Sequence, residues 1–244
     1  KDHYILYIFG NHTINKNKNF INQVDEKFYI KVISPNLDLK YGLSQDEISS
    51  RLQKLIKYSD PSVNRKTLFI WPEGVFSGYN FRDISQLQKT IFNNFSDNHF
   101  ILFGINRYDQ KKNKTYNSLV IVNNKMKIIQ EYNKKKLVPF GEFMPLENFL
   151  KKFGIKKITE GYESFLKGEE TKILILDNLK ILPLICYEII FTELVQKPLN
   201  ENNIIISISE DGWFGDSIGP HQHFSKSIFN ICYFYNRYIL SLYT

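Results

Sequence analysis

The sequence contains little of what several common protein classes require. Its 244 residues include only two cysteines, 12 glycines and 8 prolines. Two cysteines make neither a disulfide framework nor a four-cysteine zinc site, and so few glycines and prolines exclude a collagen-like chain or a low-complexity linker. Intrinsic disorder is excluded as well, because 43% of the residues are hydrophobic and 15% are aromatic.

A long uninterrupted apolar run is also missing. A membrane-spanning helix needs ~18 or more such residues, and the best window, Ile173–Phe191, contains Asp177, Lys180 and Glu188. We therefore expect no membrane span. No signal peptide is visible, the chain does not begin with Met, and its first strand-like run starts at Tyr4. We expect the chain to be a piece cut from a longer protein.

The net charge and the motifs limit the kinds of partner that this chain could bind. The chain has 32 Lys and Arg against 25 Asp and Glu, a net charge of +7, which fits contact with anionic lipid or nucleic acid. It shows no phosphate-binding glycine loop and no nucleic-acid motif, so lipid is favoured over nucleic acid. His221 and His223 form a His-x-His pattern, but no carboxylate or Cys lies nearby at a metal-ligand spacing, so no metal site is predicted.

Strand-like segments recur along the chain. The runs rich in β-branched and aromatic residues are Tyr4–Phe9, Thr67–Trp71, Phe100–Ile105, Ser118–Val122, Lys127–Tyr132, Lys172–Leu176, Ile181–Cys186 and Ile204–Ser209. The dipeptides Asn123-Asn124 and Asp177-Asn178 each separate two of these runs and predict hairpins.

Helical patterns lie between the strands. A helix is predicted over Ser44–Tyr58, where Ser44 and Glu47 form a capping-box pattern. A second is predicted from about Asp83 to Phe95, with apolar residues at helical spacing. The mixture of strands, hairpins and helices indicates an α/β or α+β layered domain with a largely buried sheet.

Three of the predicted strands run into a reactive side chain, namely Glu73, Lys134 and Cys186. Chemistry in open α/β sheets collects beyond the carboxyl ends of strands, so the three could converge although they are far apart in sequence. Taken singly, each has an ordinary reading as a solvated loop carboxylate, a surface lysine or a small buried hydrophobe.

Four ordered motifs surround these residues. They are Trp71-Pro-Glu73, Tyr132-x-Lys134-x-x-Leu137-Val-Pro-Phe-Gly-Glu142, Cys186-Tyr-Glu-Ile-Ile-Phe191 and Asp211-Gly-Trp-Phe-Gly-Asp-Ser217. Together they resemble the nitrilase superfamily, and within it the catalytic domain of the apolipoprotein N-acyltransferase family. The resemblance covers most of the chain and implies a four-layer α-β-β-α sandwich.

The resemblance also implies a site and a reaction. Glu73 matches the general base, Lys134 the oxyanion-stabilising group and Cys186 the nucleophile. The residues matched to supporting and pocket-lining positions are Glu142, Glu188, Tyr187 and Asn117. Cys186 would take an acyl group from a phospholipid as a thioester and pass it to the amino group of a diacylglyceryl-cysteine on an apolipoprotein. The resemblance requires no metal or organic cofactor and implies the periplasmic side of a bacterial inner membrane.

The stretch from Pro145 to Ile158 supports a membrane surface independently. Its apolar residues recur at i, i+3, i+4 and i+7, at Leu146, Phe149, Leu150 and Phe153, and lysines flank them. A basic amphipathic helix of this kind lies in an anionic bilayer interface. Ordinary core packing is the alternative, but the position directly after Glu142 favours a lipid-facing lid.

The chain departs from the family at several points. Phe9 stands where the family has Gln, and Glu210 replaces the usual Asn before Asp-Gly-Trp. We assign residues 1–229 to the catalytic domain and 230–244 to a divergent tail without an amphipathic pattern, and expect the sandwich to be incomplete at its C-terminus. A nitrilase-type amidase acting on a small C–N bond, an inactive truncated remnant and a lipid-surface binding module remain as alternatives.

Overall fold

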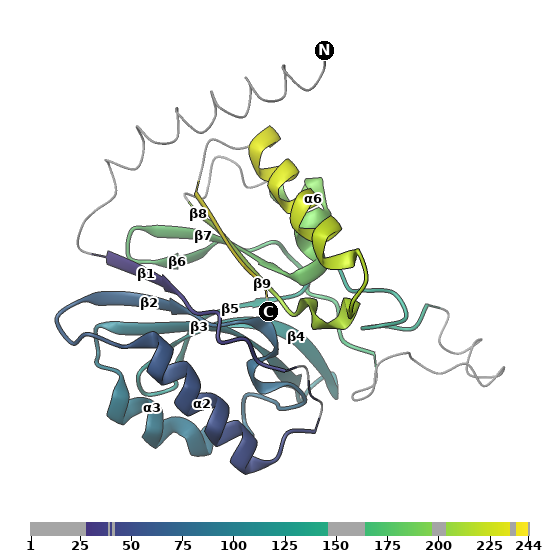
Figure 1. The fold of residues 1–244 in the computed structure, drawn as a ribbon. Helices are drawn as coiled ribbons and strands as arrows, with labels where there is room; N and C mark the ends of the chain where they lie inside the picture. The colour runs from purple at the N-terminus through teal and green to yellow at the C-terminus, as the bar shows by residue number, and fades with distance from the viewer. Residues whose placement is uncertain are drawn as a thin grey trace.

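Two β-sheets lie face to face, with helices on their outer sides (Figure 1). The computed structural model describes residues 28–38, 40, 42–145, 164–196, 204–234 and 238–243. The first sheet has the order β1-β2-β3-β4-β5, and the second has the order β6-β7-β8-β9. Their strands are β1 Phe28–Val32, β2 Lys66–Ile70, β3 His99–Asp109, β4 Lys114–Asn123, β5 Ile128–Asn133, β6 Leu174–Leu176, β7 Leu179–Ile185, β8 Ile204–Ser209 and β9 Tyr238–Tyr243.

Strand direction decides which strand ends share an edge. In the first sheet β1, β2 and β3 are parallel, whereas β4 is antiparallel to both β3 and β5. The strand β5 therefore runs in the same direction as β2, and their carboxyl ends lie at one edge. In the second sheet β7 is parallel to β8 and β8 to β9, with β6 antiparallel to β7. Both predicted hairpins, β4–β5 and β6–β7, are present.

The helices are α2 Gln45–Ser59, α3 Gln88–Asn94, α5 Thr192–Gln196 and α6 Gly219–Phe234, and short 3₁₀ turns are η1 Glu73–Phe76, η2 Ser85–Leu87, η4 Cys186–Ile190 and η5 Asp211–Phe214. The predicted first helix is confirmed with its capping box, in which Ser44 and Glu47 satisfy each other's backbone N–H groups. The second differs from its prediction, because Ser85–Leu87 winds as a 3₁₀ turn and the α-helix begins only at Gln88.

The side chains of each strand point alternately to the two faces of its sheet, and this alternation builds the four layers. In β2, Leu68 and Ile70 pack between the two sheets, whereas Phe69 packs with α2 and α3 on the outer face. In β8, Ile206 faces the first sheet and Ile205 packs against α5. Side chains alternate faces with period two, so a strand covered on both sides is apolar throughout. The expected α-β-β-α sandwich is confirmed.

The C-terminal part, assigned above to a divergent tail from residue 230, contains the end of a helix and a strand. Helix α6 continues to Phe234, and β9 pairs in parallel with β8 from Ile204 opposite Tyr238 to Ser209 opposite Tyr243. A strand in parallel pairing needs no amphipathic alternation, and Tyr238–Tyr243 is rich in aromatic and aliphatic residues that favour strands. One edge of β8 is thus covered by β9.

Two further points concern the predictions for the chain ends and the membrane. The strand predicted at Tyr4–Phe9 lies outside the described residues, and β1 was not predicted. Within the described ranges, the helices are all too short or too polar to cross a bilayer.

Candidate active site

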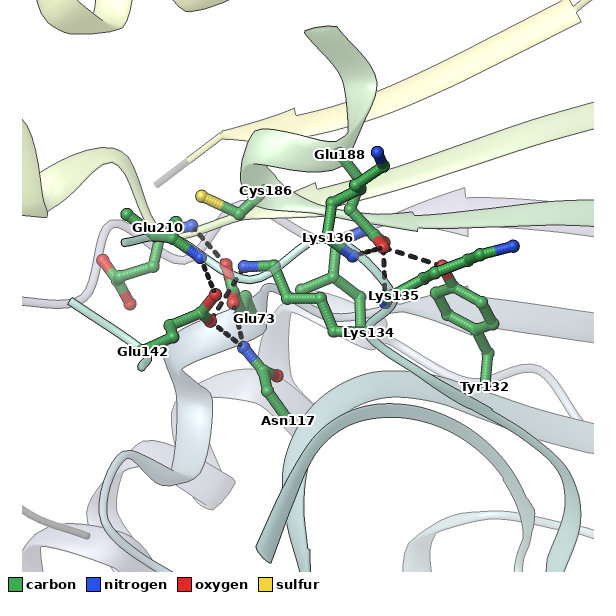
Figure 2. Close-up of polar contacts among 12 residues, drawn as sticks. Glu73, Asn117, Tyr132, Lys134, Lys135, Lys136, Glu142, Cys186, Glu188 and Glu210 are labelled. Atoms are coloured by element: carbon green, nitrogen blue, oxygen red, sulfur yellow. Dashed lines mark hydrogen bonds and ion pairs between the residues drawn. The ribbon is translucent and has the colours of Figure 1, made fainter. Parts of the chain in front are cut away.

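Glu73, Lys134 and Cys186 come together where three strands end (Figure 2). Glu73 opens η1 just after β2, Lys134 directly follows β5, and Cys186 directly follows β7. Because β2 and β5 point the same way, their ends deliver the carboxylate and the ammonium to one edge of the first sheet. The charges of Glu73 and Lys134 both act on the Cys186 thiol, so the second sheet supplies the sulfur to the same place.

Cys186 sits on a sharp turn. Its φ is 50°, in the left-handed region that residues other than glycine rarely adopt, and the chain passes there from β7 into the 3₁₀ turn η4. The backbone N–H of the preceding residue, Ile185, donates to Oε2 of Glu188 at 3.0 Å. A strained backbone persists only where its surroundings hold it, so this turn is a built feature of the site.

Glu188 ties the nucleophile turn to the segment that carries Lys134. Its Oε1 accepts from the Tyr132 hydroxyl at 2.8 Å and from the backbone N–H groups of Lys135 and Lys136 at 2.7 and 3.0 Å. The carboxyl is fully buried. Burial raises the pKa of Glu188, while the Lys134 charge and these donors act to lower it. This one side chain therefore fixes the position of the end of β7 relative to the end of β5.

The Lys134 ammonium is buried and pairs with a carboxylate instead of being solvated. Its Nζ lies 2.9 Å from Oε1 of Glu142, and the side chain is only 1% exposed. Glu142 also accepts from the backbone N–H of Val138 at 2.8 Å. The amide of Asn117 donates to Glu142 at 2.8 Å and to Glu73 at 3.0 Å. Asn117 thus bridges the two carboxylates, and the ammonium is paired in a fixed position.

The electrostatics suit a carboxylate base beside a protonated thiol. Burial raises the pKa of the Glu73 carboxyl, with Lys134 opposing and Glu142 adding to the rise. Burial likewise raises the pKa of the Cys186 thiol to about 12, and the Glu73 charge adds to it. Burial acts to lower the pKa of Lys134, but Glu142, Cys186 and Glu73 outweigh it and raise that pKa. Lys134 is therefore charged at neutral pH.

These states define what the arrangement can do. A Glu73 carboxylate of raised pKa is a better match to the thiol whose proton it would take. A permanently charged, desolvated ammonium stabilises negative charge that develops on a carbonyl oxygen. The set fits attack of a thiol on an ester, amide or thioester carbonyl.

The structure also shows where the other predicted residues lie. Tyr187 follows the nucleophile and stacks edge-on against Phe191, with ring centroids 4.9 Å apart. Leu146, Phe149, Leu150 and Phe153, predicted to face lipid, lie outside the described residues, so the lid stays a prediction. Within the described part of the chain, His, Cys, Asp and Glu form no group of three or more that could hold a metal ion.

Three contacts at the site were not predicted. The backbone N–H of Glu210 donates to Oε2 of Glu73 at 3.1 Å. His223 lies between Asp211, 3.1 Å from Nδ1, and the carbonyl oxygen of Cys186, 3.2 Å from Nε2. The motif Asp211-Gly-Trp and the Gly219–His223 stretch were visible in the sequence, but nothing local relates them to Glu73 or Cys186.

Comparison with known proteins places these motifs among relatives. A family model described as carbon-nitrogen hydrolase matches residues 42–227. Apolipoprotein N-acyltransferase of Rickettsia prowazekii is 31% identical over 228 residues, covering 91% of this chain and 44% of the relative. That of Rhodopseudomonas palustris is 30% identical, covering 84% of this chain and 40% of the relative. The chain thus spans about two fifths of the length of these relatives.

Solved structures agree on the fold. An amidase from Nesterenkonia sp. AN1 has a TM-score of 0.57 at 12% identity, covering 88% of this chain and 74% of that one. Saccharomyces cerevisiae Nit3, a member of the nitrilase superfamily, has a TM-score of 0.52 at 19% identity, covering 84% of this chain and 73% of that one.

Proposed function

Because this chain belongs to the carbon-nitrogen hydrolase family, we propose that it is the catalytic domain of an apolipoprotein N-acyltransferase. In this proposal Cys186 carries the acyl group, Glu73 moves protons and Lys134 stabilises the oxyanion. The observation that carries it is the Glu73–Asn117–Glu142–Lys134 network beside the Cys186 turn. The relatives named apolipoprotein N-acyltransferase favour this reaction over others of the family.

The first half-reaction acylates the enzyme. Glu73 accepts the thiol proton as Sγ of Cys186 attacks the ester carbonyl of a phospholipid. The tetrahedral oxyanion that results is stabilised by the Lys134 ammonium and by the backbone N–H that follows Cys186. Collapse breaks the C–O bond, and Glu73 returns the proton to the departing alkoxide. A lysophospholipid leaves and a Cys186 thioester remains.

The second half-reaction transfers the acyl group. The free α-amine of a diacylglyceryl-cysteine at the start of an apolipoprotein attacks the thioester carbonyl. Glu73 takes the amine proton and gives it to the departing Cys186 thiolate. An amide forms and the thiol is regenerated, so the two steps balance without any cofactor.

Partners and location follow from this chemistry as parts of the proposal. The donor is a membrane phospholipid and the acceptor a membrane-anchored lipoprotein, so the domain would work at the periplasmic surface of a bacterial inner membrane. The net charge of +7 favours an anionic surface. The basic amphipathic stretch with Leu146, Phe149, Leu150 and Phe153 would supply the contact.

Intact-mass spectrometry with a phospholipid donor tests the proposal. We expect one acyl adduct, located on Cys186, that disappears when a diacylglyceryl-cysteine peptide is added. Cys186→Ala should abolish the adduct, whereas the matched control Cys232→Ala should keep it, because only Cys186 ends a strand within the matched motif. An adduct that survives in Cys186→Ala would contradict the assignment.

The amidase reading is tested in the same assay. If a small amide is hydrolysed and no phospholipid acylates Cys186, the three residues perform hydrolysis of a C–N bond instead. If neither substrate reacts, the acyltransferase proposal fails and the remnant reading holds.

A further inference from the structure

His223 binds the nucleophile turn at a different backbone group from Glu188. It lies on α6, and its Nε2 is 3.2 Å from the backbone carbonyl oxygen of Cys186. A carbonyl oxygen only accepts, so Nε2 carries a hydrogen and donates it. The N–H before the turn is therefore bound by Glu188 and the C=O within it by His223.

The other ring nitrogen of His223 faces a second acceptor. Nδ1 lies 3.1 Å from Oδ1 of Asp211, and both side chains are about 95% buried, at 4% and 6% exposed. The same Asp211 oxygen accepts from the hydroxyl of Ser209 at the end of β8. Asp211 therefore anchors one ring nitrogen of His223 while the other binds the Cys186 carbonyl, so the orientation of the imidazole ring is fixed at both ends.

The carbonyl that His223 holds has a fixed relation to the next N–H. In a planar trans peptide the C=O and N–H bonds point in opposite directions, and the described chain contains no cis peptide bond. The C=O of Cys186 and the N–H of Tyr187 belong to one such peptide group. Holding the Cys186 oxygen on the α6 side therefore turns the Tyr187 N–H to the opposite side.

We propose that His223, oriented by Asp211, is a positioning residue that aims the Tyr187 N–H at the developing oxyanion. This inference rests on the proposed function, in which that N–H is an oxyanion donor beside Lys134. The positive φ of Cys186 is disfavoured for a residue with a side chain, so this backbone orientation must be held by contacts around it. The buried Asp211–His223 pair supplies one such contact, at the Cys186 carbonyl.

Kinetics on matched variants test the proposal. His223→Leu removes the donor to Cys186, whereas His223→Gln keeps a side-chain N–H. Ser227→Ala is the control, because it removes a buried hydroxyl that donates to the His223 carbonyl on the same helix and leaves the His223 ring unchanged. We expect His223→Leu to lower kcat by roughly 10- to 100-fold with little change in KM, as for a misaligned oxyanion donor. His223→Gln should recover most of kcat, and Ser227→Ala should keep it.

Two thiol reagents separate oxyanion geometry from thiol reactivity and do not depend on turnover. A small aldehyde adds reversibly to Cys186 and places an oxygen where the oxyanion would lie, whereas iodoacetamide alkylates the sulfur by displacement and forms no oxyanion. We expect His223→Leu to weaken the aldehyde adduct about tenfold or more, by the loss of an aligned donor, and to leave alkylation nearly unchanged.

Each other pattern overturns the inference. If His223→Leu weakened the aldehyde adduct and slowed alkylation by the same factor, the substitution would act on the thiol in general. If it changed neither the adduct nor the alkylation rate, His223 would be a structural residue only. If kcat in His223→Gln were no higher than in His223→Leu, the lost hydrogen bond could not be the cause of the slower reaction. If the unmodified protein is not acylated by phospholipid, the proposed function fails, while the aldehyde comparison still decides the role of His223.

Discussion

A Cβ atom placed on Gly74 would lie 1.6 Å from Oε2 of Glu210. Glu210 is buried, at 7% exposed, and its backbone N–H donates to Glu73, the residue before Gly74. Glu210 is also the position at which the resemblance described above implies Asn. The absence of a side chain at 74 therefore makes room for the larger carboxylate beside the proposed base.

This relationship predicts coupled substitutions. Gly74→Ala should destabilise the protein by about 1–3 kcal/mol, as overpacking of a filled site does. The loss should shrink when Glu210→Asn shortens the opposing side chain. Thermal or denaturant unfolding of the two single variants and the double variant measures the coupling. Additive losses would show that the two residues do not share this space.

The Lys134–Glu142 pair predicts that removing the ammonium slows acylation while the Cys186 thiol itself stays in place. Lys134→Met removes the buried ammonium, and we expect acylation of Cys186 to slow by roughly 10²- to 10³-fold, as when an oxyanion donor is lost. Rapid-quench mass spectrometry of the acyl adduct measures this rate. Lys136→Met is the matched control, because the Lys136 ammonium is partly exposed and pairs with the half-exposed Glu193, and the substitution keeps the Lys136 backbone N–H that binds Glu188. Equal rates in both variants would argue against the role of Lys134.

The pKa of Glu73 predicts the acid side of the pH profile. The base must be ionised, so activity is lost as the pH falls through the Glu73 pKa, and the raised value moves that loss to higher pH than for an ordinary glutamate. Glu142→Gln removes a charge that raises this pKa and leaves Lys134 without its nearest counter-charge. Both changes lower the Glu73 pKa.

The acid limb of kcat/KM in Glu142→Gln should therefore shift to lower pH, even though the maximal rate falls. Measurement of the pH profile in the parent and the variant checks the direction. An unshifted limb would indicate that a group other than Glu73 sets it.

The raised thiol pKa predicts how Glu73→Gln behaves. Without the carboxylate, Cys186 would react only through the small fraction of thiol that is already ionised. Below the pKa of the thiol, this fraction increases tenfold for each unit by which the pH rises. Since Glu73 helps to raise the Cys186 pKa to about 12, its neutral replacement should lower that pKa. Iodoacetamide alkylation followed against pH should show the half-point moving down. A half-point unchanged by the substitution would place Glu73 too far from the sulfur to act as its base.

Glu188 predicts a stability loss that an exposed glutamate does not share. Glu188→Gln replaces an acceptor oxygen by an NH₂ group facing backbone donors, and each unsatisfied buried donor costs about 1–3 kcal/mol. Glu193→Gln is the control, since Glu193 forms a surface pair with Lys136 and is 55% exposed. That change should cost under ~1 kcal/mol. Unfolding midpoints that drop equally in both variants would contradict the bridging role of Glu188.

The sequence by itself determined the features that depend on neighbouring residues. The capping box of Ser44 and Glu47, the two hairpin turns and the bounds of β8 follow from local spacing and composition, and all are present. The three reactive residues were singled out because each comes after a predicted strand and because the motifs around them resemble one family. A strand end can be recognised locally, and so can the residue that follows it.

Only the tertiary structure decided what surrounds those residues. Glu188 collects donors from β5, the segment after it and β7, and His223 reaches the Cys186 carbonyl across 37 positions. Strand β9 likewise owes its place to pairing with β8 rather than to its own pattern. Contacts of this kind arise when distant segments are brought within hydrogen-bonding distance. The short-range periodicities that reveal a helix or a strand do not encode which remote groups will meet there.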